Sequence, residues 1–157
     1  MNEIFINKAR AVAITGHRIL YDDFNKQELK KLLTKFVDKG FNIFLVGMAL
    51  GFDTVCFQTL EEIRNQKEIK IIACIPCLRQ DYKFTVKQKQ EYDRMLSVAD
   101  EKIILSEEYN STCMQKRNKF MVDNASGVLA YLKRDFGGTA NTVKYAEKVG
   151  VPVIIFE

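Results

Sequence analysis

The segment Met114-Gln-Lys-Arg-Asn-Lys-Phe-Met-Val-Asp123 is followed by the apolar run Val128–Leu132 and then by Phe136-Gly-Gly-Thr-Ala-Asn-Thr142. The first segment has the pattern of a helix, the apolar run has that of a buried strand, and the paired glycines stand where a second helix begins. This order of helix, strand, glycine turn and helix is typical of α/β folds. It also places an arginine and a glycine pair close to the starts of two helices.

The rest of the chain repeats this alternation. Short apolar runs predict strands at 11–15, 42–46, 70–75, 102–105, 128–132 and 152–156, and their consecutive apolar residues indicate burial on both faces. Amphipathic stretches predict helices at 24–39, 52–65, 84–99, 114–125 and 139–149. We therefore expect an α/β, three-layer Rossmann-like sandwich, in which helices cover both faces of a mostly parallel sheet of about six strands. Residues 1–157 are expected to form a single domain.

Composition narrows the class of protein. The 157 residues are 47% hydrophobic, and the net charge of +4 is not gathered into a basic run, which disfavours nucleic-acid binding. No apolar run approaches the roughly 20 residues that cross a bilayer, and Met1 to Arg10 lacks the apolar core of a signal peptide. The four cysteines are then expected to be reduced thiols of a cytoplasmic protein with no membrane contact.

Three glycine-bearing turns follow predicted strands, at the sheet edge where α/β folds bind ligands. They are Thr15-Gly16-His17-Arg18, Gly47-Met48-Ala49-Leu50-Gly51-Phe52-Asp53 and Lys133-Arg134-Asp135-Phe136-Gly137-Gly138-Thr139. Glycines let backbone N–H groups approach a phosphate closely, and a helix N-terminus carries about half a positive charge. The turns predict a phosphate-bearing, nucleotide-like ligand, although single glycine turns also arise for steric reasons alone.

Two side chains in the same regions have both a functional and a structural interpretation. Arg117, followed by Asn118, is predicted near the start of a helix, where a mobile guanidinium would donate two parallel hydrogen bonds to a phosphate. In a structural role it would be solvated or pair with Asp123. Asp53 would either accept a hydrogen bond from a ribose hydroxyl or complement a helix dipole.

The lone histidine and the cysteines are weaker candidates for chemistry. His17 could contact the ligand, take part in catalysis or be a satisfied structural residue. Cys74-Ile75-Pro76-Cys77 has the spacing of a thioredoxin-like redox motif, or it is a structural pair at the end of a strand. The remaining cysteines lack paired spacing, and one histidine does not complete a zinc site, so we expect no metal and no cofactor.

The motifs taken together resemble the SLOG superfamily of Rossmann-like proteins, which includes the LOG phosphoribohydrolases, the DprA DNA-processing proteins and the YpsA (DUF1273) family. The likeness is strongest to the YpsA family. It rests on Thr15–Arg18, Gly47–Asp53, Met114–Asp123 and Gly137–Thr139 followed by Tyr145-Ala146, which run in the expected order over nearly the whole chain. The resemblance implies binding of nucleotides or nucleotide-derived signals at the sheet edge identified above.

The resemblance also bears on catalysis. LOG enzymes cleave the N-glycosidic bond of a nucleoside monophosphate with the Arg of Met-x-x-Arg-Lys and the Glu of Pro-Gly-Gly-x-Gly-Thr-x-x-Glu. Arg117 matches that Arg, but Asn118 replaces the Lys and Lys144 occupies the position of the Glu. A carboxylate stabilises an oxocarbenium-like centre or activates water, whereas an ammonium group opposes the developing positive charge. Arg117, His17 and Glu147, one turn beyond Lys144, remain as catalytic candidates.

We therefore predict a domain that binds or senses a nucleotide or a nucleotide-derived ligand. A LOG-like nucleotide N-glycosidase is the first alternative, and a DprA-like DNA-binding protein is the second. The expected partner is a small nucleotide-like molecule. A sensing domain would act through a partner protein, and the resemblance further suggests a homo-oligomer.

Overall fold

A computed structural model describes residues 5–157 and contains a six-stranded sheet in which all neighbouring strands are parallel. The strands are β1 (Ala11–Gly16), β2 (Ile43–Val46), β3 (Lys70–Ile75), β4 (Glu101–Ile104), β5 (Gly127–Tyr131) and β6 (Val153–Ile155). The helices are α1 (Lys26–Asp38), α2 (Phe52–Arg64), α3 (Val86–Val98), α4 (Cys113–Asp123) and α5 (Gly138–Val149), and a 3₁₀ turn, η1 (Lys8–Arg10), precedes β1. The predicted α/β class and the parallel sheet are confirmed.

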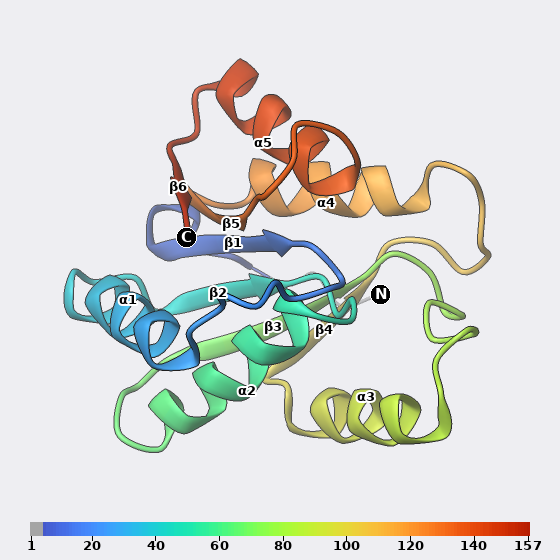
Figure 1. Cartoon of the computed structure of the whole chain (residues 1–157), viewed down its shortest axis with the longest axis horizontal. Coiled ribbons are helices and arrows are strands. Elements are labelled where there is room, and N and C mark those ends of the chain that lie inside the picture. Colours follow the sequence, from blue (N-terminus) through green and yellow to red (C-terminus); the bar gives the residue numbers. More distant parts are fainter. Residues whose placement is uncertain (1–4) are drawn as a thin grey trace.

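The strand order β4-β3-β2-β1-β5-β6 creates a reversal in the middle of the sheet. The chain moves outward from β1 to β4, and α4 then carries it back to β5 on the other side of β1. Helices α1, α2 and α3 consequently cover one face, and α4 and α5 cover the other, which gives the expected three layers (Figure 1). The reversal lies between β1 and β5, and in open α/β sheets ligands bind beyond the carboxyl ends of the strands at such a point.

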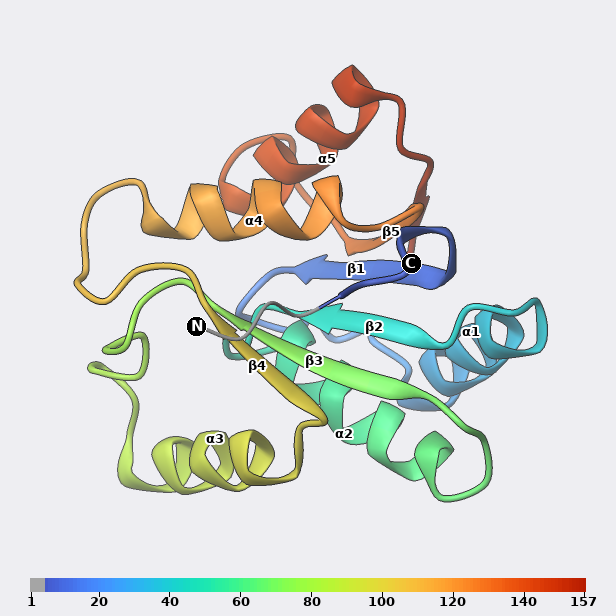
Figure 2. The same ribbon diagram turned by 180° about the vertical axis from the view of Figure 1, so that it is seen from behind.

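Each face of the sheet has its own apolar core, because successive side chains of a strand point to opposite faces. Ile14 and Val46 lie in the larger core with Phe57 of α2, under the first three helices. Ala13 and Leu45 lie in the smaller core, which α4 and α5 close. The two helices of the second face lie side by side over β1 and β5 (Figure 2).

The N-termini of the helices fall into two classes. The side chain of Asn25 caps α1 by accepting from two backbone N–H groups, and Thr85 forms a capping box with Gln88 at the start of α3. In contrast, within residues 5–157 no side chain caps the start of α2, α4 or α5. The first N–H groups of a helix need acceptors; at the start of α2 the Phe52 N–H donates to the carbonyl oxygen of His17, and which start has room for a ligand depends on its neighbours.

No helix in the described part of the chain is long and apolar enough to cross a membrane. Residues 1–4, which belong to the segment considered above for a signal peptide, lie outside the described residues.

Candidate ligand-binding site

The first two glycine turns pack against each other at the carboxyl edge of the sheet. The backbone N–H of Phe52 donates to the carbonyl oxygen of His17 at 3.1 Å. A Cβ on Gly51 would lie 2.2 Å from the carbonyl oxygen of Arg18, and one on Gly16 would lie 2.5 Å from the Phe52 ring. Glycine is therefore required at 16 and 51 so that the two turns can touch. This is the steric role considered above as the alternative to ligand binding.

His17 joins this edge to the third turn. Its Nε2 accepts a hydrogen bond of 2.9 Å from the backbone N–H of Lys133, so the neutral ring carries its proton on Nδ1. Burial, with a smaller effect of the Arg134 charge, lowers the pKa of His17. This histidine holds the end of β1 to the loop between β5 and α5, and that contact supports the structural interpretation.

Arg117 differs from the mobile side chain expected at this position, because it is only 5% exposed. From α4 its guanidinium reaches across the ends of β2 and β3, where Nη1 donates to the carbonyl oxygens of Gly47 and Cys74. Its Nε donates to Oδ1 of Asn118 at 2.7 Å. A Cβ on Gly47 would lie 2.8 Å from Nη1, so this glycine makes room for the guanidinium.

Asp53, in the first turn of α2, is buried near this arginine and feels its charge, but the two side chains form no hydrogen bond or ion pair with each other. Burial raises its pKa to about 6, while the charge of Arg117 and a hydrogen bond from the Ala49 N–H oppose the rise. Its Oδ2 accepts from Ala49 at 3.1 Å, whereas Oδ1 is buried and has no hydrogen-bond partner among the described residues. The Asp53 carboxylate and Arg117 thus hold the loop between β2 and α2, in which Met48 has a left-handed φ of 65°.

The third turn is the most open of the three. Gly137 has a φ of 96°, a value that favours glycine, and it is the N-cap residue of α5. A Cβ on Gly138 would meet no described atom within 4 Å. The first turn of α5 contains no acidic residue, and Thr139 lies there with its side chain largely buried. This helix start therefore has free space and partial positive charge at the same place.

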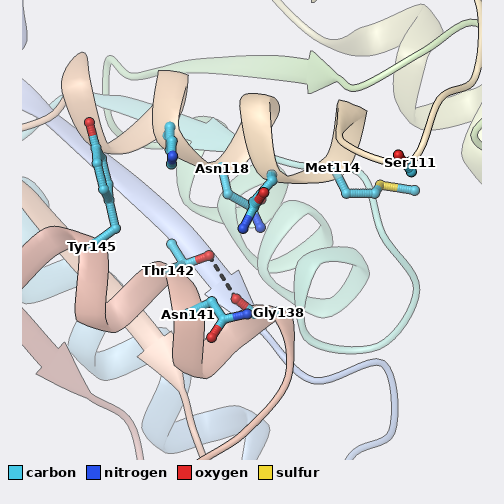
Figure 3. Close-up of a pocket in the computed structure, with 9 residues that line it drawn as sticks. Ser111, Met114, Asn118, Gly138, Asn141, Thr142 and Tyr145 are labelled. Atoms are coloured by element: carbon cyan, nitrogen blue, oxygen red, sulfur yellow. Dashed lines mark hydrogen bonds between the residues drawn. The ribbon is translucent and has the colours of Figure 1, made fainter.

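A cavity of about 310 Å³ opens beside this turn, between α4 and α5 (Figure 3). Most of its lining residues are polar but uncharged: Ser111, Met114, Gln115, Asn118, Lys119, Gly138, Asn141, Thr142 and Tyr145. Among the nine, Lys119 is the basic residue and none is acidic. Only Asn118 and Gly138 were predicted as site residues. Ser111 precedes α4. The remaining lining residues repeat at helical spacing: Met114, Gln115 and Lys119 lie one turn or less from Asn118 on α4, and Asn141, Thr142 and Tyr145 lie at i+3, i+4 and i+7 from Gly138 on α5. This spacing becomes informative once the two helices are known to face each other.

Other predicted residues lie away from this cavity. Lys144 is exposed, and its Nζ donates to the backbone oxygen of Asp135 at 3.3 Å. Glu147 is exposed near the far end of α5, nine residues from Gly138 and so about 13 Å along the helix axis. Neither of these side chains is among the lining residues.

The structure favours a packing role for the cysteines. Cys74 is fully buried in the smaller core, and burial raises the pKa of its thiol to about 12. Burial and the neighbouring Cys113 thiol also raise the pKa of Cys77. A redox nucleophile needs the opposite shift, towards the thiolate. Within residues 5–157 no group of three or more His, Cys, Asp or Glu side chains is placed to hold a metal ion.

Sequence comparison finds a matching family model and similar proteins in Bacillus. The model of the YpsA family, described as the YspA SLOG family, matches residues 22–150. The chain is 34% identical over 120 residues to the SPbeta prophage-derived protein YoqJ of Bacillus subtilis (strain 168), an alignment that covers 67% of this chain and 69% of YoqJ. It is 23% identical over 133 residues to the UPF0398 protein YpsA of the same organism, covering 76% of this chain and 74% of that protein.

Structural comparison finds the same fold in larger proteins. DNA processing protein A (DprA) from Streptococcus pneumoniae has a TM-score of 0.69 at 20% identity, over 93% of this chain and 50% of that chain. DprA from Helicobacter pylori has a TM-score of 0.67 at 19% identity, over 95% and 66%. The protein TM1055 has a TM-score of 0.56 at 16% identity, over 92% and 72%. The chain therefore spans about half to two thirds of the DprA proteins, and the likeness shows a shared fold.

Proposed function

This chain belongs to the YpsA family of SLOG proteins, and on that premise we propose that it binds or senses a small phosphate-bearing ligand of the nucleotide class. The phosphate lies at the N-terminus of α5, and the rest of the ligand occupies the cavity between α4 and α5. This cavity is called the α4–α5 cavity below.

The observation that carries the proposal is the position of an uncapped helix start at the mouth of a cavity of suitable size. Gly138 belongs both to the first turn of α5 and to the lining of the α4–α5 cavity. The cavity volume of about 310 Å³ lies at the lower end of the range of about 300–1,000 Å³ for small-molecule sites. A phosphate at this turn would accept hydrogen bonds from backbone N–H groups that no side chain of residues 5–157 caps.

The charge of the cavity supports an anionic ligand. A carboxylate in the lining would repel a phosphate, and none of the nine lining residues carries one. Lys119 adds a cation to the α4 wall, where its Nζ lies 5.4 Å from the centroid of the Tyr145 ring. The partial positive charge of the α5 N-terminus acts in the same direction.

A pair of substitutions at Gly138 tests the proposal. Gly138→Asp places a carboxylate where the phosphate is expected, while it favours α5 through the helix dipole and the loss of glycine flexibility. Gly138→Asn adds a side chain of the same size without the charge. Both have room for their Cβ atoms. Only the aspartate variant should lose ligand binding, and both proteins should stay folded.

The measurement is a thermal-shift screen against nucleoside monophosphates, cyclic nucleotides, ADP-ribose, NAD and ribose 5-phosphate. A ligand at 100 times its dissociation constant adds about 2.7 kcal/mol to the stability, which is a readily visible shift. If no phosphorylated compound shifts the wild type, or if Gly138→Asp responds as the wild type does, the proposal is wrong.

N-glycosidase activity is the first alternative, and the position of the charged side chains on α5 weighs against it. Glu147 is the one acidic residue of α5 and is exposed about 13 Å along the axis from Gly138. Lys144, at the position of the LOG glutamate, donates to a backbone oxygen outside the cavity. Chromatography of each bound nucleotide tests this alternative, since release of the free base would establish hydrolysis.

DNA binding is the second alternative, because the H. pylori DprA structure is described as one of single-stranded DNA binding. The charge of the carboxyl-edge loops opposes it. These loops carry the basic residues Arg18, Arg79, Lys83, Lys133 and Arg134 and the acidic residues Asp22, Asp23, Asp81, Glu107, Glu108 and Asp135. Such a balance does not attract a polyanion. Affinity for a single-stranded oligonucleotide that falls steeply with salt concentration would favour DNA binding over the proposal.

A further inference from the structure

Resting on the function proposed above, we infer that Asn118 is a specificity-determining residue of the α4–α5 cavity and that the ligand carries a nucleobase, whose acceptor atom binds the amide NH₂ of Asn118. The inference therefore names the chemical class of the part of the ligand that lies beyond the phosphate.

The orientation of the Asn118 amide follows from its contact with Arg117. An arginine Nε–H only donates hydrogen bonds, so the atom 2.7 Å from it must be the amide oxygen of Asn118. Arg117 is itself buried and fixed by the carbonyl oxygens of Gly47 and Cys74. The amide of Asn118 is consequently held in one orientation, with its oxygen satisfied and its NH₂ group unused by this contact.

The side chain of Asn118 projects from α4 towards α5 and lines the cavity (Figure 3). On the opposite wall, the Thr142 hydroxyl donates to the backbone oxygen of Gly138 at 2.9 Å. The Tyr145 hydroxyl donates to Oδ1 of Asp123 at 2.7 Å. Since the Thr142 hydroxyl proton is already used, its oxygen is left as an acceptor on the α5 wall. The α4 wall therefore offers an oriented donor, and the α5 wall offers an acceptor.

A nucleobase matches this arrangement better than a sugar does. Purines and pyrimidines carry fixed ring-nitrogen or carbonyl acceptors together with N–H donors, so a wall with a fixed donor distinguishes among them. Sugar hydroxyls rotate and both donate and accept, so a fixed amide donor does not discriminate among them. The thioether of Met114, which also lines the cavity, is suited to contact with the face of an aromatic ring.

The test compares the four nucleoside 5′-monophosphates with ribose 5-phosphate by isothermal titration calorimetry. Both kinds of probe carry the same phosphate, so the ratio of their dissociation constants isolates the contribution of the base. The wild type should bind at least one nucleotide about tenfold more tightly than ribose 5-phosphate, the gain expected for one well-formed hydrogen bond.

The variant for this test is Asn118→Asp. Its carboxylate still accepts from Arg117, so the fold is kept, but the donor to the cavity is lost. The preference for the nucleotide should fall to within about threefold. Asn141→Asp is the matched control, because it adds the same charge to the α5 wall, where no arginine fixes the amide. Asn141→Asp should weaken the binding of nucleotides and of ribose 5-phosphate by the same factor, so the ratio of their dissociation constants should not change.

The outcomes separate the two proposals. If ribose 5-phosphate binds the wild type as tightly as every nucleotide, or if Asn118→Asp keeps the nucleotide preference, the inference about the base is wrong and the phosphate site stands. If neither kind of probe binds the wild type, the proposed function fails and this inference fails with it.

Discussion

Replacing Arg117 by methionine should destabilise the fold more than any other change of a charged residue at the sheet edge. Methionine keeps the apolar stem but removes the hydrogen bonds to Gly47, Cys74 and Asn118. It also leaves the carboxylate of Asp53 buried without its cation. Losing the hydrogen bonds of a buried charged group and leaving a nearby buried charge uncompensated together cost about 3–5 kcal/mol. For a protein of this length, that loss lowers the melting temperature by roughly 6–20 °C.

The dependence of this loss on pH identifies its cause. The charge of Arg117 lowers the pKa of Asp53, which burial raises to about 6. Without Arg117 that pKa rises further, so at pH 5 the carboxyl group is mostly neutral in both proteins. At pH 8 the nearby guanidinium stabilises the charged Asp53 carboxylate of the wild type, whereas the variant buries that carboxylate, or a proton bound to it, without a nearby cation. The destabilisation should thus be greater at pH 8 than at pH 5, by about 1.4 kcal/mol for each unit by which Arg117 lowers the pKa of Asp53.

Urea denaturation at both pH values measures this difference. Lys116→Met is the matched control, since it changes an exposed basic residue of the same helix and should alter the stability by about 0.5 kcal/mol or less. Adding Asp53→Asn to Arg117→Met should recover part of the loss, because the uncompensated carboxylate is removed. A cost of Arg117→Met below about 1 kcal/mol would refute the buried role of Arg117, and a cost that does not change with pH would refute its electrostatic coupling to Asp53.

Three further predictions concern the same edge. Gly51→Ala should lower the free energy of unfolding by about 2–5 kcal/mol, because its Cβ would clash with backbone at a φ of 80°. Gly138→Ala should be neutral or stabilising, and equal melting temperatures of the two variants would contradict the steric role of Gly51. The pKa of Asp53 is raised from 3.8 to about 6, so the folded state binds the proton more tightly than the unfolded state. The stability of the wild type relative to Asp53→Asn should therefore fall by up to about 3 kcal/mol as the pH rises from 4 to 7. A difference that stays constant with pH would be inconsistent with burial of the carboxyl group. The pKa of His17 is lowered, so its effect on stability runs in the opposite direction with pH. The stability of the wild type relative to His17→Asn should decline as the pH falls from 7 to 5, which denaturation at each pH measures.

The prediction of the fold from the sequence succeeded because its signals are local. Each strand was visible as a short run of consecutive apolar residues, and each helix as an amphipathic stretch, with ends that lie within two residues of those in the structure. Parallel strands buried on both faces follow from such runs, since a strand exposed on one face would alternate with polar residues. The place of the three glycine turns at one sheet edge then follows from the parallel direction of the strands.

The prediction of the site was less complete, because glycine serves several purposes. Gly16, Gly47 and Gly51 were expected to contact a ligand, and the structure gives each a steric reason involving a neighbouring loop or side chain. Gly138 is the one with open space beside it. From the sequence, these four positions were indistinguishable, because the difference lies in what stands opposite each Cα.

The sequence by itself determined the secondary structure, the parallel α/β class and the edge at which ligand chemistry is to be sought. These features depend on the spacing of apolar and polar residues along the chain, because helical and strand periodicity decides which residues share a face. Only the tertiary structure decided that α4 and α5 enclose a cavity and that Arg117 lies buried against Gly47, 70 residues away in the chain. Such contacts depend on the strand order, which results from how all the helices pack on the two faces of the sheet at once.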